Sequence, residues 1–385
     1  MTRPAPAGPP ALRRHNSGLV LSALRESEGA SRAELAARTG LTRATVATLL
    51  DPLLAAGVLA EEIAPPRGVG RPSRPVRFHP DGPVALGIAL DVDSLAVCAT
   101  DLTGHVCALR KIGRDNRGRS ADALCSAAAD LAVDLRDQLG RRVLGAALAV
   151  PALLGDGGPD AREILRAPNL PRLTGARPGL ALARSLGVPV IVENEATLGA
   201  LAHLGVAPDF VVISAEIGVG GGIVLGGRVF RGVHGLAGEL GHVVVDRDGP
   251  ECGCGGRGCV EQYAGKSALL VDAGVPDVAA LQEALSSGNG RAIAAVGRAG
   301  TALGVALASV LNVLDVPVVV LGGVYAELAE AIRPGLEAEL RARSLQPSPP
   351  TVLASSLGED AAVRGAADAV LDEVRRHPDQ LVGTG

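Results

Sequence analysis

A dense cluster of cysteines with one histidine is the feature of this 385-residue sequence that points most directly to chemistry. Cys252, Cys254 and Cys259 lie within the segment ECGCGGRGC, and His242 lies ten residues before Cys252. One imidazole and three thiolates form a common tetrahedral zinc ligand set, and the intervening glycines allow the chain to turn tightly around an ion. Because four protein ligands leave no open position, we predict structural zinc rather than a disulfide or free thiols.

Acidic and amide side chains surround this cluster in the sequence. Asn169 lies in the segment APNLP, Asn194 and Glu195 follow an apolar run, and Glu239 and Glu261 flank the predicted zinc ligands. Such side chains suit a polyhydroxylated ligand, whose hydroxyls both donate and accept hydrogen bonds. Each residue taken singly also has a structural explanation, because Glu195 and Glu239 can complement helix N-termini and Asn169 can serve a turn.

The elements that must position these residues alternate between short apolar runs and longer helical segments. This alternation predicts an α/β architecture with largely parallel sheets, divided into two lobes at residues 81–205 and 206–385 with a ligand cleft between them. The expected strands span 84–90, 95–102, 143–151, 188–193, 209–215, 221–227, 316–323 and 351–356. The expected helices span about 120–139, 176–186, 195–204, 276–288, 290–312, 325–341 and 360–374.

The first 80 residues differ from the rest by their basic character, with eleven arginines and six acidic residues. Residues 1–10 are rich in proline, and we predict that they are disordered. Residues 11–80 are predicted to form a winged helix-turn-helix domain, whose first helix lies near 12–26. Ser31 begins a capping box with Glu34, which starts a second helix that ends near residue 40.

The third helix is the expected recognition helix of this domain. Thr42 is its predicted cap, and Pro52 is expected to kink or end it. Short strands near 57–59 and 76–78 would form a wing. The alternative is a helical bundle followed by a basic linker. The side chains expected to contact DNA are Thr42, Arg43, Thr45 and Thr48 on the helix and Arg71 and Arg74 on the wing loop.

Composition argues against several other classes of protein. Aromatic residues make up 1% of the chain and tryptophan is absent, which disfavours a base-stacking platform. The longest apolar stretch, 301–314, is shorter than the roughly 20 residues that span a bilayer. With no signal-like segment at the start, we predict a cytoplasmic protein without membrane contact.

Four longer segments resemble the ROK (repressor, ORF, kinase) family, and specifically its sugar-responsive transcriptional repressors. They are APNLP at 167–171, LGVPVIVENEAT at 186–197, GVGGGIVLGGRVFRGVHGLAGELGHVVVD at 218–246 and CGCGGRGCVEQY at 252–263. The resemblance covers essentially the whole chain. It implies a winged helix-turn-helix followed by a two-lobed, actin-like or ribonuclease-H-like sugar-kinase fold, and a homodimer or homotetramer.

The resemblance also implies roles for single residues. Zinc would be held by the histidine and three cysteines named above. The residues that bind sugar in family members match Asn169, Asn194, Glu239, His242 and Glu261.

The sequence departs from the kinase members of this family at three places. Their phosphate loop Asp-x-Gly-Gly-Thr is replaced by ALDVD at 89–93, which loses both glycines and adds Asp91 and Asp93 where phosphates would lie. A second loop, Gly-Thr-Gly, reads EIG at 216–218, and the catalytic aspartate is replaced by Glu195, which we keep as a ligand-binding residue at a degenerate base position. Because carboxylates repel phosphates and the backbone can no longer approach them closely, we assign no catalytic residue.

These observations predict a DNA-binding transcriptional regulator, expected to be a repressor. Its oligomer would bind a palindromic operator, and its kinase-like lobes would sense a sugar or sugar derivative without phosphorylating it. Two alternatives stay open. The chain could be an active ATP-dependent sugar kinase that keeps a DNA-binding arm, or a regulator controlled by a protein partner near the zinc loop.

Overall fold

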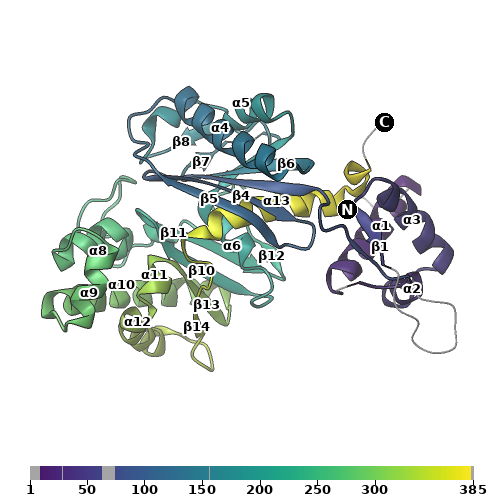
Figure 1. Ribbon diagram of the computed structural model, residues 1–385. Coiled ribbons are helices and arrows are strands. Elements are labelled where there is room, and N and C mark those ends of the chain that lie inside the picture. The colour runs from purple at the N-terminus through teal and green to yellow at the C-terminus, as the bar shows by residue number, and fades with distance from the viewer. Residues whose placement is uncertain (1–8, 28, 63–73, 156, 383–385) are drawn as a thin grey trace.

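The computed structural model describes residues 9–27, 29–62, 74–155 and 157–382, which form an N-terminal domain beside two stacked lobes (Figure 1). Each lobe contains a five-stranded sheet. The first sheet has the order β5-β4-β3-β6-β9, with bounds β3 (Val84–Leu90), β4 (Ser94–Asp101), β5 (Val106–Gly113), β6 (Val143–Val150) and β9 (Val190–Asn194). The second has the order β12-β11-β10-β13-β14, with bounds β10 (Phe210–Ala215), β11 (Val219–Leu225), β12 (Arg228–Val229), β13 (Val318–Gly323) and β14 (Thr351–Ala354).

The two sheets share one topology. In each, the first three strands form an antiparallel meander, a fourth strand pairs in parallel with the first, and a fifth pairs in parallel with the fourth. The predicted α/β class and two-lobed organisation are therefore confirmed, and all eight predicted strands coincide with observed ones. The expectation of largely parallel sheets is wrong, because each sheet has two antiparallel and two parallel pairings. The strand β5 was not expected, because it lies at the sheet edge and carries polar residues such as Arg110 and Lys111.

Helices cover both faces of each sheet. The outer face of the first sheet packs on α4 (Ala121–Leu139) and α5 (Pro178–Leu186). The outer face of the second packs on α7 (Glu261–Ala264), α8 (Lys266–Ala273), α9 (Val278–Ser286), α10 (Gly290–Leu314), α11 (Val324–Glu327) and α12 (Ala329–Arg343). Two helices lie between the sheets, α6 (Glu195–Ala202) and α13 (Ala361–Arg376) (Figure 1). The remaining short elements are β7 (Leu153–Leu154), β8 (Ile164–Arg166), η1 (Pro171–Leu173), η2 (Leu240–His242), η3 (Gly358–Asp360) and η4 (Pro378–Leu381).

The C-terminal helix α13 corrects the predicted extent of the second lobe. That lobe does not run to residue 385, because α13 crosses back and buries Val363 and Ala366 against the inner face of the first sheet. It also crosses α6 so closely that a Cβ at Gly365 would lie 1.8 Å from the carbonyl oxygen of Leu198. Only glycine allows this approach, which fixes α13 against the first lobe.

The N-terminal domain contains α1 (Pro9–Arg25), α2 (Arg32–Thr39), α3 (Arg43–Ala55) and an antiparallel pair, β1 (Leu59–Glu61) with β2 (Val76–Phe78). The capping box is present, because Ser31 Oγ accepts from the Glu34 amide at 3.2 Å and the Glu34 carboxylate accepts from the Ser31 amide at 2.7 Å. These elements match the predicted winged helix-turn-helix. Two expectations change: α1 already begins at Pro9, and α3 continues through Pro52 to Ala55.

The N-terminal domain is joined to the first lobe through α13. Its apolar core, which includes Val20, Leu24 and Leu50, is continuous with Val374 of α13 and Leu381 of η4. The two helices α1 and α13 approach closely, since a Cβ at Gly18 would lie 3.2 Å from the carbonyl oxygen of Arg375. Both ends of the chain therefore contribute to the junction that holds the N-terminal domain.

Helix α10 is longer than the apolar stretch identified in the sequence. It spans 25 residues and is long and apolar enough to cross a bilayer by length and composition alone. One of its faces is buried against α12 in the core of the second lobe, through residues such as Leu303 and Leu307. This packing accounts for its apolar composition without a membrane.

Candidate ligand and metal sites

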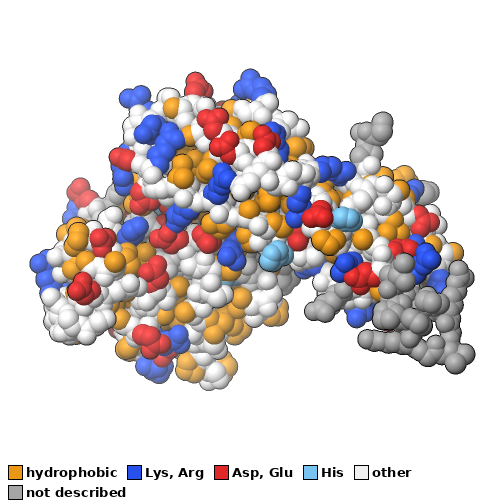
Figure 2. Space-filling model, in the orientation of Figure 1, with side chains coloured by type: hydrophobic (Ala, Val, Ile, Leu, Met, Phe, Trp, Pro, Cys, Tyr) orange, Lys and Arg blue, Asp and Glu red, His pale blue; other side chains and the backbone are white. Residues whose placement is uncertain are grey.

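A cleft of about 390 Å³ lies between the lobes and is lined by residues of both. Acidic and basic side chains of the two lobes meet along the groove that separates them on the visible face (Figure 2). The structure places all six predicted ligand residues in the lining of this cleft: Asn169, Asn194, Glu195, Glu239, His242 and Glu261. Their convergence on one cavity makes the binding prediction geometrically possible.

The predicted zinc ligands converge beside the cleft. The donor atoms of His242, Cys252, Cys254 and Cys259 all lie within 4.8 Å of one another. The sulfurs of Cys254 and Cys259 are 3.7 Å apart, and the Cys252 sulfur lies 3.7 Å from His242 Nδ1. With metal–sulfur bonds of about 2.3 Å, the edge of a tetrahedron measures about 3.8 Å. The donor set and its spacing therefore fit a zinc ion.

The segment between His242 and Glu261 forms a tight loop that brings these ligands together. Antiparallel bridges pair Val244 with Cys259 and Glu251 with Arg257. Gly258 has φ +66°, and a Cβ there would lie 1.5 Å from the carbonyl oxygen of Asp246. Glycine is therefore required at position 258 by close backbone contact as well as by the turn.

The two ring nitrogens of His242 serve different neighbours. Nδ1 faces the cysteine cluster, whereas Nε2 lies 3.8 Å from Glu239 Oε2 on the cleft side. A metal bound at one nitrogen leaves the other free for a hydrogen bond. The two roles predicted for His242, as metal ligand and as cleft residue, are therefore compatible.

Glu261 links the metal loop to the glycine-rich strand β11. One carboxylate oxygen accepts from the Val219 amide at 3.1 Å, and the other lies 3.9 Å from the Cys252 sulfur. With Glu239 and His242, it forms what we call the metal-braced end of the cleft. The position of these three side chains depends on the fold of the cysteine loop.

Asn194 has a structural role in addition to its place in the cleft. Its side-chain oxygen caps α6 by accepting from the amides of Ala196 and Thr197, and its nitrogen donates to Glu195 at 2.8 Å. Asn169 instead lies exposed in a turn, and within the described ranges its side chain has no hydrogen-bond partner. The turn expected at Asn169 is therefore present, whereas the capping role of Asn194 was not predicted.

Three carboxyl groups line the other side of the cleft: Asp91, Glu195 and Glu216, which we call the acidic end. Burial raises the pKa of Glu195 and the pKa of Glu216 to about 8, and the charge of Asp91 adds to both shifts. Burial also raises the pKa of Asp91 itself. Burial therefore favours the neutral, protonated form of these carboxyl groups.

Asp93 does not lie where the sequence suggested. It is absent from the cleft lining, and its carboxylate is 3.7 Å from Lys266 Nζ at the start of α8. The expectation that Asp93 occupies a phosphate position is therefore not supported by the packing. Asp91 and Glu216, by contrast, do line the cleft.

The predicted DNA-contacting residues lie on one helix and the wing. Thr42, Arg43 and Thr48 are exposed, although the Thr42 hydroxyl also caps α3 by accepting from the Thr45 amide at 3.1 Å. Exposed Arg74 forms an ion pair with Glu61 at 3.6 Å. Arg71 lies outside the described residues. Arg43 is thus the exposed cation at the start of the expected recognition helix.

Comparison with known proteins agrees with this architecture. A model of the ROK family matches residues 85–373, and a model of winged helix-turn-helix DNA-binding domains matches residues 13–60. The xylose repressor of Bacillus subtilis strain 168 is 27% identical over 375 residues, which cover 93% of this chain and 95% of the repressor.

Solved structures give the same fold. A ROK family transcriptional regulator, a homologue of the E. coli MLC protein, superimposes with a TM-score of 0.81 at 24% identity, covering 97% of this chain and 99% of that one. A ROK hexokinase from Thermus thermophilus has a TM-score of 0.61 at 30% identity, covering 76% of this chain and 99% of the hexokinase. The likeness to the regulator includes the N-terminal domain, whereas the hexokinase spans only about three quarters of the chain.

Proposed function

The chain belongs to the ROK family and is a DNA-binding transcriptional regulator, and from that premise we propose that its cleft senses a sugar without phosphorylating it. The observation that carries this proposal is the contrast within one cleft. Glu239, His242 and Glu261, beside the cysteine loop, line the metal-braced end, whereas Asp91, Glu195 and Glu216, whose pKa values are raised by burial, line the acidic end. A neutral sugar suits both ends, whereas a triphosphate would have to place its charge beside carboxyl groups in a setting where burial disfavours charge.

The sugar would contact the side chains of Asn169, Asn194, Glu239, His242 and Glu261. Glu239 and His242 can accept or donate hydrogen bonds at the exposed side of the cleft. Burial raises the pKa of Glu195 to about 8, so this residue would donate a hydrogen bond to a sugar hydroxyl when protonated and accept one when ionised. The relative from Bacillus subtilis is a xylose repressor, so D-xylose is the first sugar to test.

Zinc would be held by His242, Cys252, Cys254 and Cys259. The ion would cross-link the loop and would not take part in catalysis, because the protein would occupy all four of its coordination positions. The metal would hold His242 in its orientation, and Glu261 beside it, so that the binding wall is formed before the sugar arrives.

Operator binding would use Arg43, Thr45 and Thr48 on α3, its cap Thr42, Arg74 beside the wing strand β2, and Arg71, which lies outside the described residues. We infer a homodimer or homotetramer acting in the cytoplasm as a repressor, since a palindromic operator requires two such domains. A coupling free energy of about 1–3 kcal/mol between sugar and operator would change operator affinity about 5–150-fold.

Operator affinity with and without sugars tests the proposal. The purified full chain is titrated with DNA from upstream of its own gene, alone and with D-xylose, other neutral monosaccharides and their phosphates. We expect one neutral sugar to lower operator affinity at least fivefold and to raise the melting temperature. Unchanged DNA binding and melting across the whole panel would refute sugar sensing.

The alternative of an active sugar kinase is tested by coupled ATP consumption. We expect no saturable, sugar-dependent turnover, because Asp91 and Glu216 lie at the phosphate side of the cleft. Control by a protein partner would instead be indicated by sugar-insensitive operator binding that a purified partner alters.

A further inference from the structure

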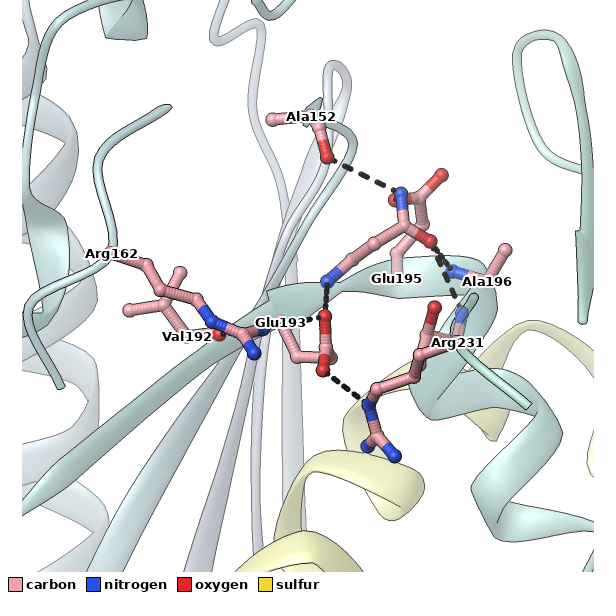
Figure 3. Close-up of polar contacts among 9 residues, drawn as sticks. Ala152, Arg162, Val192, Glu193, Glu195, Ala196 and Arg231 are labelled. Atoms are coloured by element: carbon pink, nitrogen blue, oxygen red, sulfur yellow. Dashed lines mark hydrogen bonds and ion pairs between the residues drawn. The ribbon is translucent and has the colours of Figure 1, made fainter. Parts of the chain in front are cut away.

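A buried carboxylate in β9, which the proposed function does not use, lies between two arginines (Figure 3). The Glu193 side chain is only 10% exposed. One of its oxygens is 3.0 Å from Arg162 Nη1, and the other accepts from Arg231 Nε at 2.9 Å. A charge this well buried requires partners, and here it has one on each oxygen.

The two arginines come from different lobes. Arg162 belongs to the segment between β7 and β8 in the first lobe, the same lobe as Glu193. Arg231 follows β12 in the second sheet. The ion pair between Glu193 and Arg231 therefore crosses from one lobe to the other, whereas the pair with Arg162 does not.

This crossing pair lies directly beside the ligand cleft. Glu193 precedes Asn194, which caps α6 and lines the cleft, and its Oε1 accepts from the Asn194 amide at 3.1 Å. Arg231 begins the loop that ends at Glu239, and its carbonyl oxygen accepts from the Ala237 amide at 3.1 Å. A second hollow of about 160 Å³ contains Glu193 and both arginines and shares Asn194 and Glu239 with the main cleft.

The charge of Glu193 does not depend on Arg231 alone for its neutralisation. Two guanidinium groups face one carboxylate, so Glu193 keeps a partner when either arginine is removed. Loss of Arg231 therefore does not leave an unpaired buried charge, which is the change that would unfold the region. What it removes is the connection between the lobes.

We propose that Arg231 is a positioning residue, whose ion pair with Glu193 sets the arrangement of the two lobes and thereby the distance between the two walls of the ligand cleft. This inference rests on the proposed sugar-sensing function of that cleft. Other polar contacts join the lobes: Arg166 donates to the Gly253 carbonyl oxygen at 2.9 Å, Lys266 pairs with Asp93, and buried His203 lies 2.7 Å from Ser355 Oγ. The Glu193–Arg231 pair differs from them because it joins a largely buried carboxylate to a cation.

The test compares three variants of the full chain: Arg231→Ala, Arg162→Ala and Arg231→Lys. Arg162→Ala is the matched control, since it removes the same charge from the same carboxylate but leaves the connection between lobes intact. Genetically encoded spin labels replace exposed Asp134 in α4 and exposed Glu330 in α12. The distribution of distances between the two labels is measured by pulsed electron paramagnetic resonance.

We expect Arg231→Ala to broaden or shift this distribution in the absence of any ligand. Arg162→Ala should match the wild type, and Arg231→Lys should restore most of the wild-type distribution because it retains the charge. Equal distributions for Arg231→Ala and Arg162→Ala would overturn the proposal. A loss of secondary structure in Arg231→Ala would also overturn it, because the residue would then be needed for folding.

Sugar affinity provides a second readout that separates this inference from the proposed function. For the sugar that alters operator binding of the wild type, Arg231→Ala should raise Kd about tenfold and Arg162→Ala less than threefold. If both variants bind that sugar like the wild type, the positioning role fails while sugar sensing stands. If no sugar in the panel acts on the wild type, sugar sensing fails, and the label distances alone decide whether Arg231 positions the lobes.

Discussion

The metal-braced end and the acidic end of the cleft differ in what holds their polar side chains in place. Glu239, His242 and Glu261 are held by a loop whose fold depends on a cluster of metal-type ligands. Glu195 and Glu216 have no such support, and burial raises the pKa of each to about 8. One end is organised to present hydrogen-bonding groups, and the other discourages negative charge. The difference teaches that two ends of one cleft can present polar groups in different electrostatic settings.

The largest expected effect comes from removing the metal at the braced end. Cys254→Ser, or exhaustive chelation of the wild type, should lower the melting temperature by more than about 10 °C and reduce soluble yield, because a structural zinc ion contributes several kcal/mol of folding free energy. Metal content by mass spectrometry and thermal unfolding check this. Cys107→Ser is the control, since Cys107 lies outside the cluster. A metal-free protein with unchanged melting would contradict a structural metal.

A smaller but sharper contrast comes from mutating one carboxylate at each end. Glu239→Ala should raise the Kd for the effector sugar about 30-fold, because a ligand hydroxyl loses its partner at a cost of about 2 kcal/mol. Asp91→Asn should change that Kd less than threefold. Isothermal titration measures both, with Glu251→Ala as a control on the exposed side of the metal loop. Equal losses at the two ends would remove the distinction between them.

The pH dependence of stability tests the acidic end alone. Burial raises the pKa of Glu216 from 4.5 to about 8 in the folded chain. The contribution of its protonation to folding stability is therefore fully present below pH 4.5 and is lost as the pH rises through 8. Glu216→Gln should therefore melt about 3 °C higher than the wild type at pH 9. The difference should shrink toward pH 5.

Thermal unfolding across this pH range, with Asp93→Asn as the exposed control, provides the measurement. A difference between Glu216→Gln and the wild type that stays constant from pH 5 to 9 would show that ionisation of Glu216 is not involved.

The smallest expected effect concerns Lys266, the cation beside the acidic end. Its ion pair with Asp93 at 3.7 Å is partly exposed, so Lys266→Gln should change the unfolding free energy by less than about 1 kcal/mol. Chemical denaturation at low and high salt checks this. A loss of several kcal/mol would mean that Lys266 neutralises the acidic end directly and that the two ends are less different than described.

Much of this architecture could be predicted from local sequence. The capping box at Ser31, the strand of residues 84–90 and the cysteine-rich loop each depend on residues that are close together in the chain. Their physical causes, which are side-chain capping, apolar periodicity and ligand spacing, are therefore visible in a short window.

Features that depend on distant partners could not be predicted in the same way. The return of α13 to the first sheet requires the contact between Gly365 and Leu198, which no local pattern specifies. Glu193 is not among the predicted site residues, although it ends the apolar run VPVIVE. A carboxylate in such a run indicates a buried charge, which needs oppositely charged partners. The exposed side chain of Asp93 faces Lys266 on α8 rather than the cleft, a contact that no local pattern specifies.

The joining of α1 to α13 has a consequence for the synthesis of this protein. The helices of the N-terminal domain leave the ribosome first, but α13 and Leu381, against which α1 packs, are translated more than 330 residues later. At about 5–20 residues per second, this interval lasts roughly 15–70 s. The nascent regulator therefore reaches its complete DNA-binding domain only after the ligand-sensing lobes have been made, so a truncated chain lacks a fully packed DNA-binding domain.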